Sequence, residues 1–103
     1  MKPEGTIRVE IVHNVKNPDK SLIRTNVRKG MVSGILGEWI HSQIEKDEDE
    51  SKAKEKDVYQ IVIELDLRDD TFHTISNTGN KGLTAGIILS IKNGLDKIEI
   101  VNL

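Results

Sequence analysis

The sequence contains no cysteine and only three aromatic residues, Trp39, Tyr59 and Phe72. The absence of cysteine excludes disulfide bonds, thiolate catalysis, cysteine-ligated zinc and iron–sulfur clusters. It also favours a reducing, intracellular compartment, because small secreted domains usually depend on disulfides. With so few aromatic rings, the core must be built from Ile, Val and Leu. The rings are also too few to stack the bases of a single-stranded nucleic acid.

Long apolar runs are absent as well. No stretch approaches the roughly 18 consecutive apolar residues of a membrane-spanning helix, and the first residues lack the apolar run of a signal peptide. We therefore expect a cytoplasmic protein with no membrane partner. The net charge is −2, from 15 Lys and Arg against 17 Asp and Glu. The chain as a whole thus gives no electrostatic reason to bind nucleic acid.

The length of 103 residues predicts a single small domain, residues 1–103. Within it, the segment 45–57 contains only one apolar residue, Ala53, among many charges. We interpret this segment as a frayed helix end or a flexible loop. A calcium-binding EF-hand loop would require a glycine that the segment lacks, so no metal site is expected there.

Hydrophobic periodicity predicts four strands and two helices. The strands, residues 6–12, 58–68, 71–76 and 97–103, are marked by apolar residues at alternate positions. The helices, residues 28–46 and 81–93, carry apolar residues three or four apart. Residues 21–26 are ambiguous, being either a further strand that pairs back on the first or the lead-in to the first helix.

The order β-α-β-β-α-β predicts an α+β two-layer sandwich. Both helices would cover one face of a four-stranded antiparallel sheet, in the ferredoxin-like arrangement. Each half would be a right-handed β-α-β unit with one strand of the other half between its two strands. Counting residues 21–26 as a strand gives a competing arrangement with five strands. No internal repeat is apparent in the sequence.

A carboxylate and an imidazole are expected to face each other across the predicted hairpin. A two-residue turn at 69–70 would place Asp66 opposite His73, on the face of the sheet away from the helices. A carboxylate that orients an imidazole is half of a general-base arrangement. No nucleophile accompanies the pair, however, so a simple cross-strand pair is favoured. His13 and His41 have no ligand spacing, and zinc is not expected.

A glycine-bracketed turn joins the strand 71–76 to the helix 81–93. Unpaired N–H groups at a helix N-terminus attract anions, and glycine lets a ligand approach the backbone. Lys81 would add a cation, and two threonines would add hydroxyl donors. The predicted anion-binding residues are Thr78, Gly79, Asn80, Lys81, Gly82 and Thr84. The competing interpretation is a tight turn in which Asn77, Thr78 or Asn80 caps the helix.

The same turn offers an alternative function. Gly79–Gly82 matches the GxxG pattern with which KH domains clamp a nucleic-acid backbone, although in KH domains this loop joins two helices. It is not a Walker A loop, because Leu83 follows the second glycine where that loop has lysine.

The open face of the predicted sheet carries one β-branched apolar residue from each strand: Val12, Val62, Ile75 and Val101. If these side chains lie at similar heights, they form a contiguous patch of the kind that marks interfaces. Charges of both signs around the patch suit a self-complementary two-fold contact. Ordinary strand propensity would also explain these residues.

Together these patterns predict a small, non-enzymatic α+β module without a cofactor. We expect it to bind a partner protein or a small anionic ligand, and to form a homodimer. The alternative is a nucleic-acid-binding module that uses the GxxG turn. A hydrolytic enzyme that uses His73 and Asp66 has less support.

Overall fold

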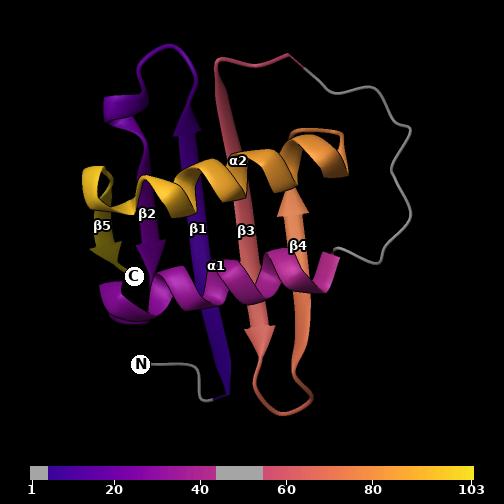
Figure 1. Cartoon of the computed structure of the whole chain (residues 1–103). Helices are drawn as coiled ribbons and strands as arrows, with labels where there is room; N and C mark the ends of the chain where they lie inside the picture. Colours follow the sequence, from indigo (N-terminus) through magenta and orange to yellow (C-terminus); the bar gives the residue numbers. More distant parts are fainter. Residues whose placement is uncertain (1–4, 44–54) are drawn as a thin grey trace.

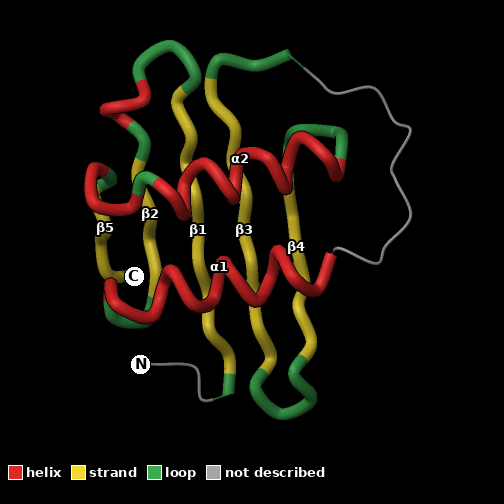
Figure 2. Tube along the Cα trace, in the orientation of Figure 1, coloured by secondary structure: helices red, strands yellow, loops and turns green. Residues whose placement is uncertain are grey.

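The computed structural model describes residues 5–43 and 55–103, which form a five-stranded sheet with two helices on one of its faces (Figure 1). The helices run across the strands and are antiparallel to each other (Figure 2). The strands are β1 (Thr6–Asn14), β2 (Leu22–Thr25), β3 (Val58–Asp66), β4 (Thr71–Ser76) and β5 (Glu99–Asn102). The helices are α1 (Lys29–Gln43) and α2 (Lys81–Asn93), with short 3-10 turns η1 (Pro18–Lys20) and η2 (Leu95–Lys97).

The strand order is β4-β3-β1-β2-β5, and all neighbours are antiparallel except β2 and β5. The predicted α+β class is therefore confirmed. The four-stranded antiparallel sheet and the ferredoxin-like order are wrong, because the sheet is mixed and has five strands. The ambiguous residues 21–26 supply the extra strand, β2.

The presence of β2 explains the different order. β2 reverses the chain before α1 begins, so the strand after the helix, β3, returns antiparallel to β1. It lies directly beside β1, in a ladder that runs from Thr6 opposite Asp66 to Asn14 opposite Val58. No strand is therefore inserted between the two, as a ferredoxin-like unit would require. The last strand, β5, adds to the edge of β2 in parallel.

The core lies between the sheet and the helix layer. Alternate residues of β1 and β3 turn inward, and one face of each helix packs on them. Trp39 closes this layer by donating its indole N–H to the hydroxyl of Thr74, at 2.7 Å. As predicted, aliphatic residues dominate; the fully buried ones are Val9, Ile11, Ile23, Val32, Leu36, Ile61, Ile63 and Ile88.

Helix α2 has the predicted bounds, 81–93. It begins at Asn80, whose side-chain oxygen accepts the N–H of Leu83 at 2.9 Å, and it ends at Gly94. Asparagine at the N-cap is a usual start signal and glycine after the last turn a usual stop signal, which is why the sequence located this helix. For the predicted charged segment 45–57, only residues 55–57 belong to the described part of the chain.

The hairpin of β3 and β4 has a different register from the predicted one. Asp66 lies opposite Thr71, and His73 lies opposite Glu64. The loop therefore contains four residues, 67–70, instead of two. The predicted pairing of Asp66 with His73 is wrong.

The side chain of Asp66 accounts for the longer loop. Its Oδ1 accepts the backbone N–H of Arg68 at 3.0 Å, which turns the chain away from the ladder two residues early. The N–H of Leu67 donates instead to the carbonyl of Gly5, and the Leu67 side chain is 54% exposed. Asp70 then takes a left-handed conformation with φ 55°, which aspartate tolerates better than most residues.

Two β-β-α units make up most of the chain: β1-β2-α1 and β3-β4-α2. Their first strands begin at Thr6 and Val58, and their helices at Lys29 and Lys81, so both offsets are 52 residues (58 − 6 and 81 − 29). The ladder between the two units is centred on Glu10 opposite Val62, which are also 52 residues apart. The two units are therefore related by an approximate two-fold axis through this central pair.

A short sequence match accompanies this symmetry. Thr25-Asn26 corresponds to Ser76-Asn77, Lys29-Gly30 to Lys81-Gly82, and Gly34-Ile35 to Gly86-Ile87. The second unit has one additional residue before its helix, and Gly79 in that connection has φ +75°. The expectation of no internal repeat is thus wrong; the repeat was hidden by the different side chains on the strands.

The two equivalent asparagines make the same contacts. Asn26 Oδ1 accepts the backbone N–H of Arg8, and Asn77 Oδ1 accepts that of Gln60, both at 2.9 Å. Their own N–H groups donate to the carbonyls of Arg8 and Gln60 at 3.4 and 3.2 Å. In each unit, a side-chain carbonyl thus replaces the backbone carbonyl at the point where the chain leaves the sheet for the helix.

We expect Asn26→Ala to lower the free energy of unfolding by about 1–3 kcal/mol, because it leaves a half-buried backbone N–H without a partner. Asn77→Ala should cost less, since water can reach the exposed bond to Gln60. Asn26 also donates to the carbonyl of Thr6, a second bond lost in the variant. Urea unfolding measures both values. Asn17→Ala is the control, because the Asn17 side chain caps no helix; it should leave the free energy of unfolding unchanged.

Candidate functional site

The hydroxyl groups of the predicted anion-binding turn point into the protein. Thr78 and Thr84 are buried, with their hydroxyl oxygens 2.6 Å apart, and the hydroxyl of Ser76 lies 3.0 Å from each. Both threonine hydroxyls also donate to the carbonyl of Asn80, at 2.9 and 3.0 Å. These groups are therefore engaged in closing the turn and do not face an external anion.

Asn80 is the helix cap, one of the three candidates that the sequence offered. Its Oδ1 binds the N–H of Leu83, and its own N–H donates to the hydroxyl of Thr78 at 3.2 Å. Lys81 and Gly82 are exposed in the first turn of α2. The geometry fits a capping turn between β4 and α2, whereas a KH-type GxxG loop joins two helices. Anion binding at this turn stays a prediction.

Asp66 is held by Arg68 rather than by the predicted His73. The Arg68 guanidinium donates to both carboxylate oxygens of Asp66 at 3.3 Å, from Nε and Nη2. These side-chain bonds, followed by the backbone N–H of Arg68, lower the pKa of Asp66 below its ordinary value of 3.8. Because Asp66 lies opposite Thr71 and His73 lies opposite Glu64, the predicted general-base arrangement of Asp66 and His73 is not formed.

We expect Arg68→Ala to raise the pKa of Asp66 back toward 3.8. The folded-state pKa of Asp66 is below its unfolded value, so its contribution to stability is present above the unfolded pKa. That contribution is lost as the pH falls through the folded pKa. A carbon-detected NMR titration of the side-chain carboxyl measures the shift. His73→Ala is the control and should change the pKa far less; an equal change would restore the predicted pairing.

The described residues offer no metal site. Within 5–43 and 55–103, no three His, Asp or Glu side chains are grouped to hold an ion. His13 lies at the border of the core, where burial lowers its pKa, and its Nδ1 has no hydrogen-bond partner among the described residues. A lone histidine of this kind has no second ligand.

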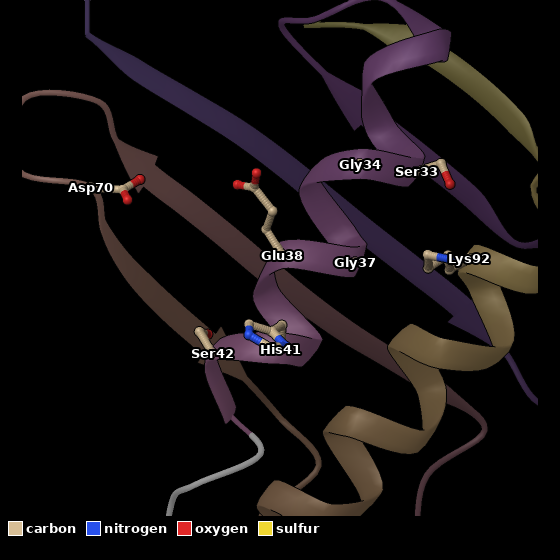
Figure 3. Close-up of a pocket in the computed structure, with 8 residues that line it drawn as sticks. All are labelled: Ser33, Gly34, Gly37, Glu38, His41, Ser42, Asp70 and Lys92. Carbon is tan, nitrogen blue, oxygen red and sulfur yellow. The ribbon is translucent and has the colours of Figure 1, made fainter.

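An open depression lies along the outer side of α1 (Figure 3). Figure 3 shows its side chains spread along the helix instead of converging on one point. Such convergence is what a catalytic site requires. The lining residues are Ser33, Gly34, Gly37, Glu38, His41 and Ser42 of α1, Asp70 of the β3–β4 turn and Lys92 of α2.

The glycines of α1 are not explained by close packing. A Cβ atom at Gly30 or Gly34 would meet no atom within 4 Å, and one at Gly37 would lie 3.2 Å from Cε of Lys92. Gly86, the equivalent of Gly34 in α2, is equally open. Glycine inside a helix costs up to ~1 kcal/mol relative to alanine. Nothing within the described part of the chain requires glycine at the three open positions, Gly30, Gly34 and Gly86.

We expect Gly34→Ala to raise the free energy of unfolding by roughly 0.5–1 kcal/mol, because the helix gains propensity and no atom is displaced. Gly79→Ala should lower it by about 1–2 kcal/mol, since the left-handed φ of +75° strains any residue with a Cβ. Thermal and urea unfolding measure both. A destabilised Gly34→Ala protein would mean that this face of α1 is covered in solution.

The open face of the sheet brings three of the four predicted interface residues together. Ile75 on β4 lies directly opposite Val62 on β3, and Val12 on β1 lies directly opposite Leu22 on β2. Because Val62 faces Glu10 and Val12 faces Gln60, Val62 and Val12 are diagonal neighbours. The four side chains form a diagonal stripe across β4, β3, β1 and β2, which we call the apolar stripe.

The remaining predicted residue, Val101, lies opposite Arg24 on β5, two positions from the Leu22–Glu99 pair. It extends the apolar stripe only at its end. Leu22 was missed by the sequence analysis because residues 21–26 were ambiguous. Its alternation with buried Ile23 was the available signal.

Comparison with protein-family models, with curated proteins and with solved structures found no match to this chain. Among the described residues, no helix is long and apolar enough to cross a membrane.

Proposed function

We propose that this chain is a non-enzymatic protein-interaction module that forms a homodimer through the open face of its sheet. The observation that carries the proposal is the apolar stripe, which lies on the face that neither helix covers (Figure 1). Ile75 is 67% exposed and Val101 41% exposed on this face. Isolated apolar residues on a surface need no explanation, but a connected row across four strands favours contact with another protein.

Charges beside the stripe support a self-complementary contact. Arg8 donates from Nε to Glu10 at 2.7 Å and from Nη1 to Glu64 at 2.9 Å, which joins β1 and β3 on the open face. The bond to Glu10 is the main cause of a raised pKa at Arg8, so the guanidinium keeps its charge. Arg24 and Glu99 add both signs near the other end of the stripe. A two-fold contact can pair opposite charges from such a mixed rim.

The stripe is tested by the substitution Val62→Lys and by the mass of the protein in solution. The wild-type dimer should have a mass of about 23 kDa by light scattering, twice the 11.6 kDa of one chain. Val62→Lys places a charge at the centre of the stripe, where desolvation in an interface is costly, and should give a monomer.

Leu89→Lys is the matched control. Leu89 is 47% exposed on α2, in the opposite layer of the molecule, so this change adds the same charge outside the proposed contact. It should leave the mass unchanged. A monomeric wild-type protein would contradict the homodimer, and a dimer that survives Val62→Lys would place the contact on another surface.

A further inference from the structure

The two edges of the sheet are equivalent in the internal symmetry, but within 5–43 and 55–103 a further strand pairs with one of them and not with the other. β2 and β4 are the second strands of the two β-β-α units, and β5 pairs with β2. In the described part of the chain, no strand lies on the outer side of β4. The outer edge of β4 is therefore equivalent to the outer edge of β2, which pairs with β5.

Both edges present the same backbone groups. Asn26 and Asn77 exchange hydrogen bonds with the first strand of their unit. Along an antiparallel strand, the backbone N–H and C=O groups of successive residues face opposite neighbours. The backbone groups of the residue just before each asparagine therefore face away from the first strand, toward the edge of the sheet. In β2 the outward carbonyl of Thr25 accepts the N–H of Leu103 at 3.0 Å, directly after β5. In β4 the equivalent outward groups belong to Ser76 and, two residues earlier, to Thr74.

The described edge of β4 lacks Lys, Arg, Asp, Glu, proline and bulges, which are features that usually prevent strand addition. β4 reads TFHTIS and contains no Lys, Arg, Asp, Glu or Pro. Its register with β3 continues without a bulge from Asp66 opposite Thr71 to Ile61 opposite Ser76. Natural edge strands are commonly protected by charges, proline or bulges. An edge without these features is instead a template for pairing.

We propose that the edge of β4 is a binding site for an extended peptide segment of a partner protein. The segment adds parallel to β4, as β5 adds to β2, and carries aliphatic side chains at alternate positions. In β5 these positions are held by Ile98, just before the strand, and Ile100, which are half-buried against the core, while Glu99 and Val101 are exposed. This site is separate from the proposed contact through the sheet face.

The probe is a fluorescent peptide with the sequence of residues 97–103, KIEIVNL, because this segment fits the equivalent edge. Fluorescence anisotropy with the full-length protein should show saturable binding. Thr74→Pro removes the outward N–H of the edge and should weaken binding at least about tenfold. Thr74→Val, which loses the same hydroxyl but keeps the backbone N–H, is the matched control and should bind like the wild type. Circular dichroism checks that both variants fold.

Two modified peptides test the same point with the wild-type protein, in case Thr74→Pro does not fold. Since the N–H of Leu103 faces β2, that of Val101, two residues earlier, does so too, and that of Ile100 faces away. N-methylation at Val101 should abolish binding, whereas N-methylation at Ile100 should leave it nearly unchanged. Equal effects of the two modifications would overturn a backbone-paired strand.

Other outcomes also decide against the proposal. Absence of saturable binding would overturn it, and so would equal binding by Thr74→Pro, since the peptide would then lie elsewhere or displace β5. A solution dimer that Thr74→Pro abolishes, without peptide binding, would assign the edge to a second copy. The peptide titration is repeated with the Val62→Lys protein. Peptide binding that persists in this variant shows that the edge site does not depend on the proposed contact through the sheet face.

Discussion

The ladder between β1 and β3 is the contact on which the rest of the structure depends. It joins nine residue pairs at the centre of the sheet, and its inward side chains form the floor of the core. Val9 and Ile61, for example, are fully buried because both helices cover their face of the sheet. Burial of aliphatic area at about 25 cal/mol per Å² is the main favourable term in such a core. A one-residue slip of this ladder would turn every inward side chain outward.

The central ladder also sets the internal symmetry. Its middle pair joins Glu10 to the equivalent residue of the second unit, Val62. The two β-β-α units therefore lie side by side in one sheet, with their first strands antiparallel. Asn26 and Asn77 then end the two hairpins in the same way. The symmetry is broken at the edges, because β5 adds to β2 alone. Among the described residues, this asymmetry leaves the outer edge of β4 without a neighbouring strand.

Both proposals rest on continuous surfaces of the described residues and not on a converging set of functional side chains. The depression along α1 has no converging set of functional side chains, and the hydroxyls near Gly79 are used to close a turn. By contrast, the apolar stripe and the β4 edge are continuous surfaces made of backbone and aliphatic groups. A strand added to a sheet edge supplies backbone hydrogen bonds and alternate side chains, both of which a polypeptide carries. The two proposals therefore concern protein partners.

Local signals in the sequence determined a good part of this protein. The asparagine and glycine caps located α2, and alternation in 58–66 identified the inward side of β3, since both depend on residues close together in the chain. The repeated Lys-Gly and Gly-Ile pairs were also present, although the repeat was recognised only once the fold aligned them. Four apolar residues of the open face, Val12, Val62, Ile75 and Val101, were likewise predicted individually, whereas Leu22 was not.

Tertiary structure decided the strand order, the register of the β3–β4 hairpin and the joining of those apolar residues into one stripe. Residues 21–26 became an inner strand because β5, which is distant in the sequence, pairs with β2 on the side opposite β1. At the end of the hairpin ladder, the N–H of Arg68 donates to Oδ1 of Asp66 and the N–H of Leu67 donates to the carbonyl of Gly5. A periodic pattern does not encode such a bond or the choice of a neighbour, because period-two alternation fixes a face of a strand and not its partner.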